Sequence, residues 1–470
     1  MATAMSLVEA GFCQCLNGLC ASCGKSQGMT HSSSLFASAT MDALLAAILS
    51  QTSPNLSPAG LAAVCLANRR LQLATEPHLY RSVVFDMGDA KRTSRTMSLL
   101  ATLAGSAKHA GFVRKVYAAK FAASSEFVFT NIDLVLSAIE KMVRLEVLHC
   151  TDTWEFMLFV ITSGVHFPGL HTCAIPYIGP SCGTFVARHS NSLRNLRIHT
   201  SAAHLALRDT GQPILQELSL PRLQTFVGPP ILAELWLRQS HTQLCHVILS
   251  CDRSIGPHVP TKPALRLLET ARLESCSVFV SSLNTSFLPA LAAHMPKVQF
   301  VTFLLDKTPI AEPDYDRFLS SVPDSLPALH RLTSLDICMF LTSYPTKDTP
   351  LASLKLRILG ELAVVRRWGQ LCPLLDHVRL RSGWDWVRVL PDRGMWGLPS
   401  GLGYDHRCGG MNVAEVNDLL LVDKQQAAAI SQLRKRGPGA FEAALADMQR
   451  RIANVERMRA RLNALLKSSV

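Results

Sequence analysis

One hydrophobic pattern recurs along most of the chain: apolar, two variable residues, apolar, one variable residue, apolar. Its last two apolar positions are two residues apart, which is the spacing of side chains on one face of a β-strand. We therefore predict a strand at each copy. The copies are Val113/Val116/Ala118, Leu145/Leu148/Cys150, Leu170/Cys173/Ile175, Leu193/Leu196/Ile198, Leu215/Leu218/Leu220, Leu232/Leu235/Leu237, Leu268/Ala271/Leu273, Val298/Val301/Phe303, Leu332/Leu335/Ile337 and Leu375/Val378/Leu380.

The segments between these copies carry helical patterns. Residues 131–142, 283–295 and 359–371 place apolar side chains at steps of three and four, as amphipathic helices do. Stacked strand–helix units at such spacings are typical of leucine-rich repeats. The pattern predicts an α/β fold, an irregular leucine-rich-repeat-like solenoid with a C-terminal cap over residues 86–396. The alternative is a doubly wound α/β domain, but the sequence has no Gly-rich strand-to-helix phosphate loop to support it.

In a solenoid of this kind, the residues that alternate with core positions line the concave face. The predicted lining is His149, Asn195, Arg197, His199, Glu217, Glu234, Trp236, Arg238, Arg272, Glu274, Asp336, His377, Arg379 and Arg381. Large aromatic and arginine side chains dominate binding energy where interfaces have hot spots. The candidate substrate-binding residues are therefore Arg197, Trp236, Arg238, Arg272 and Arg379. Most of the remaining residues also fit plain solvated strand positions.

The N-terminal region is organised differently. Residues 1–40 are rich in Ser, Gly, Ala and Cys without a sustained period, which predicts a disordered tail. Residues 41–50 form a helical stripe, and Ser57-Pro58 is a strong signal for a second helix, which we expect to end at Glu76-Pro77. Residues 78–85 are typical of a β-strand. The sequence thus predicts a short helical module over residues 41–85.

This module resembles the F-box family in the form common in fungal proteins. The resemblance is carried by LLAAILS, LAAVCLANRRLQ and especially EPHLYRSVVF, residues 76–85. It implies docking on a Skp-type adaptor and, through that adaptor, on a cullin ubiquitin ligase. The implied docking residues are Leu44, Leu45, Ile48, Leu61, Val64, Cys65 and Leu66. The same apolar stripes also fit an ordinary helical cap on the repeat array.

The C-terminal end carries its own signals. Trp384, Trp386 and Trp396 follow the last repeat and are expected to pack over the end of the solenoid. Residues 397–411 are Gly-rich and indicate a linker, and residues 412–470 a helical tail. Within that tail, apolar residues over 440–466 form a coiled-coil-like stripe. It predicts either self-association or packing back onto the array.

Composition and sequence patterns indicate the cellular compartment in which the protein is expected. The chain carries 47 Lys+Arg against 35 Asp+Glu, and 48% of its residues are hydrophobic. No apolar stretch reaches the roughly 18 residues of a membrane span, and the N-terminus lacks the basic start of a secretory signal. We expect an intracellular protein, cytoplasmic or nuclear, whose 14 cysteines are mostly thiols. The spread of positive charge does not specify nucleic acid, so no nucleic-acid or membrane partner is expected.

Catalytic motifs are missing from the sequence. Cys13, Cys15, Cys20 and Cys23 have thiolate spacing, but the loop between the pairs is shorter than in usual zinc modules, which favours an unstructured tail. The sequence contains no nucleophile elbow, no zinc-protease helix and no kinase set. We expect a non-enzyme without metal or cofactor.

The combined expectation is a substrate-recruiting adaptor of a Skp–cullin–F-box ubiquitin ligase, with an unidentified protein substrate held by the array. The alternative is a leucine-rich-repeat scaffold that binds proteins without joining a ligase. A third possibility is a basic adaptor whose C-terminal helix binds acidic surfaces.

Overall fold

The computed structural model describes residues 57–67, 69–119, 131–150, 154–199, 218–237, 243–250, 268–270, 272–280, 285–305, 312–339, 351–380, 384–390 and 395–397, with single residues at 266, 283 and between 435 and 464. The chain divides into two compact units, Met1–Leu79 and Tyr80–Val470. The predicted tail 1–40, the helix 41–50, the linker from residue 398 and the coiled-coil stripe as a whole lie outside the described residues.

In the first unit, two helices pack against each other: α3 (Pro58–Ala67) and α4 (Arg69–Leu79). The predicted helix start is confirmed, since the Ser57 hydroxyl accepts the N–H of Gly60 at 3.1 Å and Pro58 occupies the first helical position. The expected end at Glu76-Pro77 is wrong, because α4 continues to Leu79. A proline in the last turn of a helix disturbs only that turn, so it need not end the helix before it.

The second unit is built on a thirteen-stranded sheet of described residues, with its strands in chain order. They are β1 (Ser82–Asp86), β2 (Lys115–Ala119), β3 (Val147–Cys150), β4 (Thr172–Pro176), β5 (Asn195–His199), β6 (Thr225–Gly228), β7 (His246–Ser250), β8 (Ser275–Val280), β9 (Phe300–Leu305), β10 (Ser334–Met339), β11 (His377–Arg379), β12 (Asp385–Leu390) and β13 (Met395–Gly397). All pairs from β1 to β11 are parallel, and β12 and β13 are added antiparallel.

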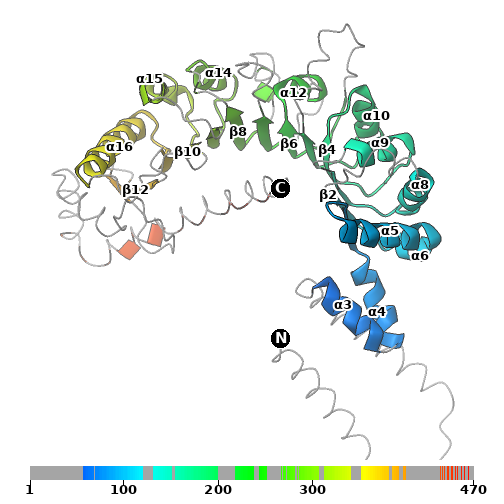
Figure 1. Ribbon diagram of the computed structural model, residues 1–470. Helices are drawn as coiled ribbons and strands as arrows, with labels where there is room; N and C mark the ends of the chain where they lie inside the picture. The colour runs from blue at the N-terminus through cyan, green and yellow to red at the C-terminus, as the bar shows by residue number, and fades with distance from the viewer. Residues whose placement is uncertain are drawn as a thin grey trace, which may run out of the picture. The chain divides into compact units, whose positions relative to one another are not determined.

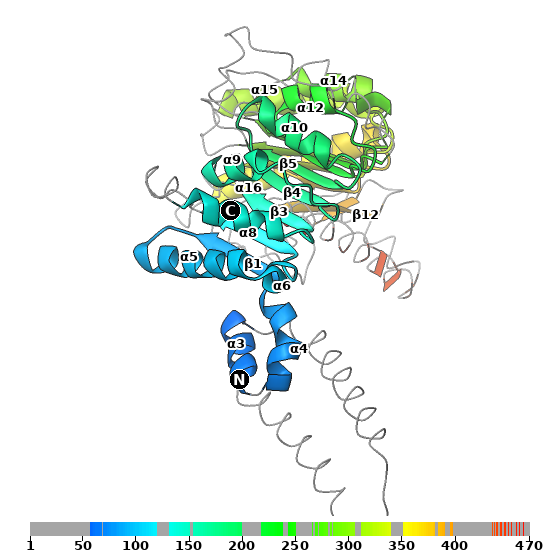
Figure 2. The same ribbon diagram turned by 90° about the vertical axis from the view of Figure 1, so that its right-hand side faces the viewer.

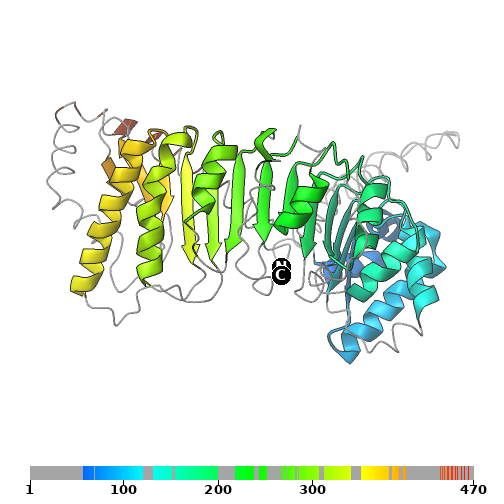
Figure 3. The ribbon, with the colours of Figure 1, turned by 90° about the horizontal axis from the view of Figure 1, so that it is seen from above.

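Helices lie along the outer side of this curved sheet (Figure 1), stacked side by side across it (Figure 3). They are α5 (Ala90–Gly105), α6 (Ala107–Ala110), α8 (Ile132–Lys141), α9 (Trp154–Thr162), α10 (Pro180–Arg188), α12 (Pro230–Trp236), α14 (Phe287–His294), α15 (Glu312–Ser321) and α16 (Leu351–Leu371), with short 3₁₀ turns η4 (Leu268–Thr270), η5 (Val322–Asp324) and η6 (Leu326–Ala328). The turned view in Figure 2 shows the same layering. The predicted α/β solenoid is confirmed, since a doubly wound sheet has helices on both faces.

A repeated backbone contact sets the register of the strands. The N–H groups of Arg114 and Lys115 both donate to the carbonyl of Arg81, at 2.9 and 3.0 Å. The same doubled contact recurs at the carbonyls of Arg114, Glu146, His171, Arg194, Gln224, Cys245, Glu274, Gln299 and Thr333. Successive strands therefore start level with each other, whatever the length of chain between them.

Three copies of the hydrophobic pattern were placed wrongly. Leu215/Leu218/Leu220 and Leu268/Ala271/Leu273 precede their strands, and Leu232/Leu235/Leu237 falls on the helix α12 and the residue after it. The residues that occupy the three pattern positions of the strands β6, β7 and β8 are instead Leu223/Phe226/Gly228, Leu244/Val247/Leu249 and Leu273/Cys276/Val278. The reason is that a spacing of three apolar residues also fits a helical turn, and Pro230 is well suited to begin a helix.

The core is one continuous layer of apolar side chains from Val83 to Trp396, between sheet and helices. Its C-terminal end is closed as predicted, because Trp384, Trp386 and Trp396 are all buried. The indole N–H of Trp386 donates to Glu361 of α16 at 3.1 Å. The sheet thus ends on a short hairpin that α16 covers.

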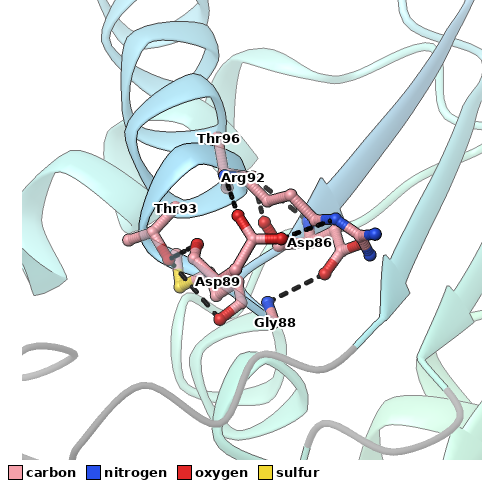
Figure 4. Close-up of polar contacts among 7 residues, drawn as sticks. Asp86, Gly88, Asp89, Arg92, Thr93 and Thr96 are labelled. Carbon is pink, nitrogen blue, oxygen red and sulfur yellow. Dashed lines mark hydrogen bonds and ion pairs between the residues drawn. The ribbon is translucent and has the colours of Figure 1, made fainter.

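The first strand is joined to α5 by a compact polar turn (Figure 4). The Asp89 carboxylate caps the helix by accepting the N–H of Arg92 at 2.8 Å, and the Arg92 guanidinium contacts Asp86 at 2.7 Å. The Asp86 carboxylate also accepts the N–H of Gly88, and Thr96 donates to the Asp86 carbonyl. These contacts fix the orientation of the first strand–helix unit.

Candidate functional site

The helix α3 is apolar on every side. Its sequence, PAGLAAVCLA, holds no charged residue and no hydroxyl or amide side chain, yet of its described side chains only Leu61 is buried, at 6% exposed. Val64 and Cys65 are partly exposed, and Leu66 is 88% exposed. On α4, Leu73 is 56% exposed. The first unit therefore presents large apolar side chains that a stable surface helix normally keeps covered.

The candidate docking residues fall into two groups. Leu61, Val64, Cys65 and Leu66 lie on α3 in the exposure states just described, while Leu44, Leu45 and Ile48 lie outside the described residues. Burial, and then the charge of Glu76, raises the pKa of the Cys65 thiol. Cys65 thus acts as a small apolar residue and not as a reactive thiolate.

On the second unit, strand register defines the concave face, the face of the sheet away from the helices. Core residues such as Val116, Leu148 and Leu196 point to the helices, so their strand neighbours point the other way. Register aligns the concave positions of β2–β5 in one row: Tyr117, His149, Ala174 and Arg197. We call Lys115, Tyr117, His149, Arg197 and His199 the basic face.

Ala174 is the smallest side chain in the row that contains Tyr117, His149 and Arg197. It pairs with His149 on one side and with Arg197 on the other, so those two side chains stand two strands apart, roughly 10 Å. The rings of Tyr117 and His149 meet edge to face with centroids 5.1 Å apart. The larger side chains of His149 and Arg197 thus flank Ala174, which is buried.

Arg197 and His199 of the basic face differ in their charge at neutral pH. Burial lowers the pKa of Arg197 to about 10, which keeps the guanidinium charged at neutral pH. Burial, followed by the charges of Arg197 and His149, lowers the pKa of His199 to about 3, so this imidazole is neutral. The Nε2 atom of His199 is buried and has no hydrogen-bond partner among the described residues. Burying such an atom without a partner costs about 1–3 kcal/mol.

The other end of the concave face holds a network of paired charges. The imidazole of His377 lies between two carboxylates, with Nδ1 3.1 Å from Asp336 and Nε2 3.2 Å from Asp385. Asp385 also contacts Arg379 at 3.4 Å, and the Ser334 hydroxyl lies 2.9 Å from His377 Nδ1. The group contains a serine, a histidine and an aspartate, but both ring nitrogens face carboxylates and the serine is buried. The arrangement holds β10, β11 and β12 together.

Of the predicted substrate-binding residues, Trp236 was wrongly placed on the concave face. It is fully buried on α12, where it is part of the core. Arg197 and Arg379 do lie on concave strand positions, whereas Arg272 is exposed on the segment that leads into β8. Arg238 lies outside the described residues.

The other predicted lining residues divide in the same way. His149, Asn195, His199, Asp336 and His377 are on the concave face, Glu234 is on α12, Glu274 precedes β8, and Glu217 and Arg381 lie outside the described residues. Sequence reasoning missed Lys115 and Tyr117. The signal was present, because Tyr117 stands between the core positions Val116 and Ala118.

In the described part of the chain, no three His, Cys, Asp or Glu side chains are grouped so that they could hold a metal ion. The Cys13–Cys23 cluster lies outside that part. Among the described helices, none combines the length and the apolar character that crossing a bilayer requires.

Comparison with known proteins adds little. No protein-family model matches the chain. No curated protein matches it either. Among solved structures, the complex of Rad7 and Elc1 from yeast includes a similar chain, with 10% sequence identity and a TM-score of 0.30 over 69% of this chain and 96% of that one. A likeness this weak carries no functional conclusion.

Proposed function

We propose that this chain is a substrate-recruiting adaptor of a Skp–cullin–F-box ubiquitin ligase. In this proposal the unit Met1–Leu79 docks on a Skp-type adaptor, and the concave face of the unit Tyr80–Val470 binds a protein substrate. The observation that carries the docking half is the apolar character of α3, combined with the exposure of Leu66 on α3 and of Leu73 on α4.

The energetic argument is simple. Removing a fully exposed leucine side chain from water yields about 1.5–3 kcal/mol, so Leu66 and Leu73 together provide a substantial part of a docking interface. A polar surface helix would need no such cover. The F-box resemblance of residues 41–85 supplies the class of partner, because modules of that family dock through apolar helices on a Skp-type adaptor.

The proposed mechanism needs no bond-making group in this chain. An adaptor accelerates transfer of ubiquitin by holding the substrate close to the ligase, which raises its effective concentration. On the substrate side, Arg197 is the principal candidate, with Arg272, Arg379 and Arg238 as further contacts. Arg379 already contacts Asp385, so a substrate would have to compete with that ion pair.

The test is capture of a purified Skp-type adaptor by the full chain. Leu66→Asp places a charge on the exposed side of α3 and should weaken capture by at least roughly tenfold. The matched control is Leu356→Asp on α16, which makes the same change at a leucine that is 73% exposed, and should leave capture unchanged.

Two outcomes would contradict the ligase function. One is failure of the wild-type chain to capture the adaptor at micromolar concentrations. The other is an equal loss in Leu66→Asp and Leu356→Asp. Either would leave the alternative function, a repeat scaffold that binds proteins outside a ligase.

A further inference from the structure

We infer that the basic face binds an acidic peptide segment of a partner protein, with Arg197 at the centre of the contact. The inference rests on the proposed function, since it names the chemical class of the substrate that the concave face would hold. It uses strands β2–β5, remote in sequence from the helices proposed for docking.

The sign of the charge is the first argument. From β2 to β9, the described concave strand positions hold no Asp or Glu, while Lys115, His149, Arg197, His199 and His246 lie among them. The first carboxylate in this direction is Asp336 on β10. Lys115 and Arg197 carry the positive charge, whereas the imidazole of His199 is neutral. A face with positive charge and no carboxylate at its described strand positions attracts acidic groups.

The arrangement of donors is the second argument. The guanidinium of Arg197 can donate to both oxygens of a carboxylate, and such charge-assisted pairs are among the strongest hydrogen bonds. His149 stands across Ala174 from Arg197, and His199 follows Arg197 by two residues on β5. The buried Nε2 of His199, without a partner among the described residues, would gain one from a ligand in this position.

The surroundings favour a peptide over a nucleic acid. Binding of a nucleic acid backbone relies on several Lys and Arg side chains in series. On β2–β5 the described concave positions carry two such residues, Lys115 and Arg197, and apolar or aromatic side chains flank them: Tyr117 and, on β6, Val227. An Asp or Glu side chain beside an apolar residue complements this mixture.

The chain's own tail is a poor occupant on charge grounds. Residues 412–470 contain more Lys and Arg than Asp and Glu, so their net charge has the same sign as the basic face. Like charges brought together weaken an interface. A separate acidic partner is therefore favoured over an intramolecular contact.

The experiment measures binding of two fluorescein-labelled peptides of about twelve residues to the full chain, a length that spans the four strands when extended. One peptide alternates Glu with Ser, and the other replaces each Glu by Gln. The Glu peptide should bind at least roughly tenfold more tightly, and Arg197→Gln should abolish most of that difference. Arg331→Gln removes the same charge from an exposed position before β10 and should stay within about twofold of wild type.

A folding control is required because Arg197 is half-buried. Arg197→Lys keeps the charge but loses the two-pronged geometry, so it should retain part of the preference for the Glu peptide. Equal binding of both peptides by wild type, or equal losses in Arg197→Gln and Arg331→Gln, would overturn the inference. Displacement of the Glu peptide by oligothymidine in an Arg197-dependent manner would overturn the assignment to a peptide.

The same proteins separate this inference from the proposed function. Leu66→Asp should lose adaptor capture and bind the Glu peptide as wild type does. Adaptor capture without peptide binding would reject the acidic substrate class alone. Peptide binding without adaptor capture would reject the ligase function alone.

Discussion

The two ends of the concave face use charge in opposite ways. On β2–β5, Arg197 and its neighbours stand in a region whose described concave positions hold no carboxylate. On β10–β12, the imidazole of His377 lies between Asp336 and Asp385, and Arg379 contacts Asp385. The same backbone scaffold carries both arrangements, so the difference lies in the side chains alone.

This contrast teaches where each kind of charge is useful. A charge pair buried near the last strands replaces solvent contacts by fixed partners and ties a hairpin to the parallel sheet. A cation on a face whose described strand positions carry no carboxylate contributes a positive charge that can take part in binding an acidic ligand. Mutations at the C-terminal end are therefore expected to lower the stability of the protein, whereas mutations on the basic face are expected to weaken binding.

The largest expected effect is that of His377→Ala. It leaves Asp336 buried and deprives both carboxylates of the imidazole between them, which should reduce the free energy of unfolding by about 3–5 kcal/mol. Urea unfolding measures this change. His330→Ala, at an exposed turn before β10, is the control and should have almost no effect. Similar losses in the two variants would remove the distinction between the two ends.

The second effect concerns acid sensitivity in the N-terminal half. His189 is buried, accepts the N–H of Phe167 on Nε2 and contacts the carbonyl of Phe185 through Nδ1, so it fits as the neutral form. Burial foremost, with the charges of His166 and Arg188, lowers the pKa of His189 to about 4. The unfolded chain then binds a proton that the folded chain does not, between its ordinary pKa near 6.5 and 4.

The free energy of unfolding should therefore fall by about 3 kcal/mol from this group as pH drops from 7 to 4. Above pH 6.5 the contribution is fully present. His189→Gln should be less stable at pH 7 but should lose less on acidification, and urea unfolding at a series of pH values compares the two. Parallel curves for wild type and variant would show that His189 does not titrate in this way.

A third effect tests the closure of the C-terminal end. A Cβ atom added at Gly369 would lie 2.8 Å from the Trp396 ring, so Gly369→Ala should destabilise the protein by about 1–3 kcal/mol. Gly360→Ala, on the same helix, meets nothing within 4 Å and should stabilise by about 0.5–1 kcal/mol through helix propensity. Thermal unfolding of the pair measures both. A gain at both positions would mean that the indole moves aside.

The smallest effect is that of salt. Between 50 and 200 mM sodium chloride, binding of the Glu peptide to the basic face should weaken about three- to tenfold, because counterions screen charges that are accessible to solvent. The free energy of unfolding, which depends on paired and buried charges, should hardly change over the same range. Salt-independent peptide binding would indicate an apolar contact in place of an ionic one.

Much of the solenoid could be predicted from the sequence, because core leucines before and within strands have a fixed spacing. The copies on β2–β5 and β9–β11 coincide with observed strands. For β6, β7 and β8 the predicted positions were wrong. One reason is that Leu232 and Leu235, which lie on a helix, have the same spacing as the strand pattern. What identifies the strand β6 is Leu223 and the doubled contact that the N–H groups of Gln224 and Thr225 make with the Arg194 carbonyl, a tertiary feature that the local pattern does not contain.

The site was predictable only in part for the same reason. Arg197 was found because it stands between the core positions Leu196 and Ile198. Trp236 was misassigned because burial depends on which face of α12 meets the sheet, and that face is set by packing. The pairing of His377 with Asp385 was equally out of reach, since it needs the antiparallel return of β12.

Because successive strands start level with each other, the parallel sheet presents side chains at a constant spacing from one strand to the next. Neighbouring strands are about 4.8 Å apart, so the three steps from β2 to β5 measure roughly 14 Å, the length of about four residues of extended peptide. The number of residues between successive strands varies widely, while the register at the strand starts stays the same. A peptide bound across the basic face would thus contact these strands through about four consecutive residues. Exchanging the concave residues of a single strand would then change the preference at about one peptide position.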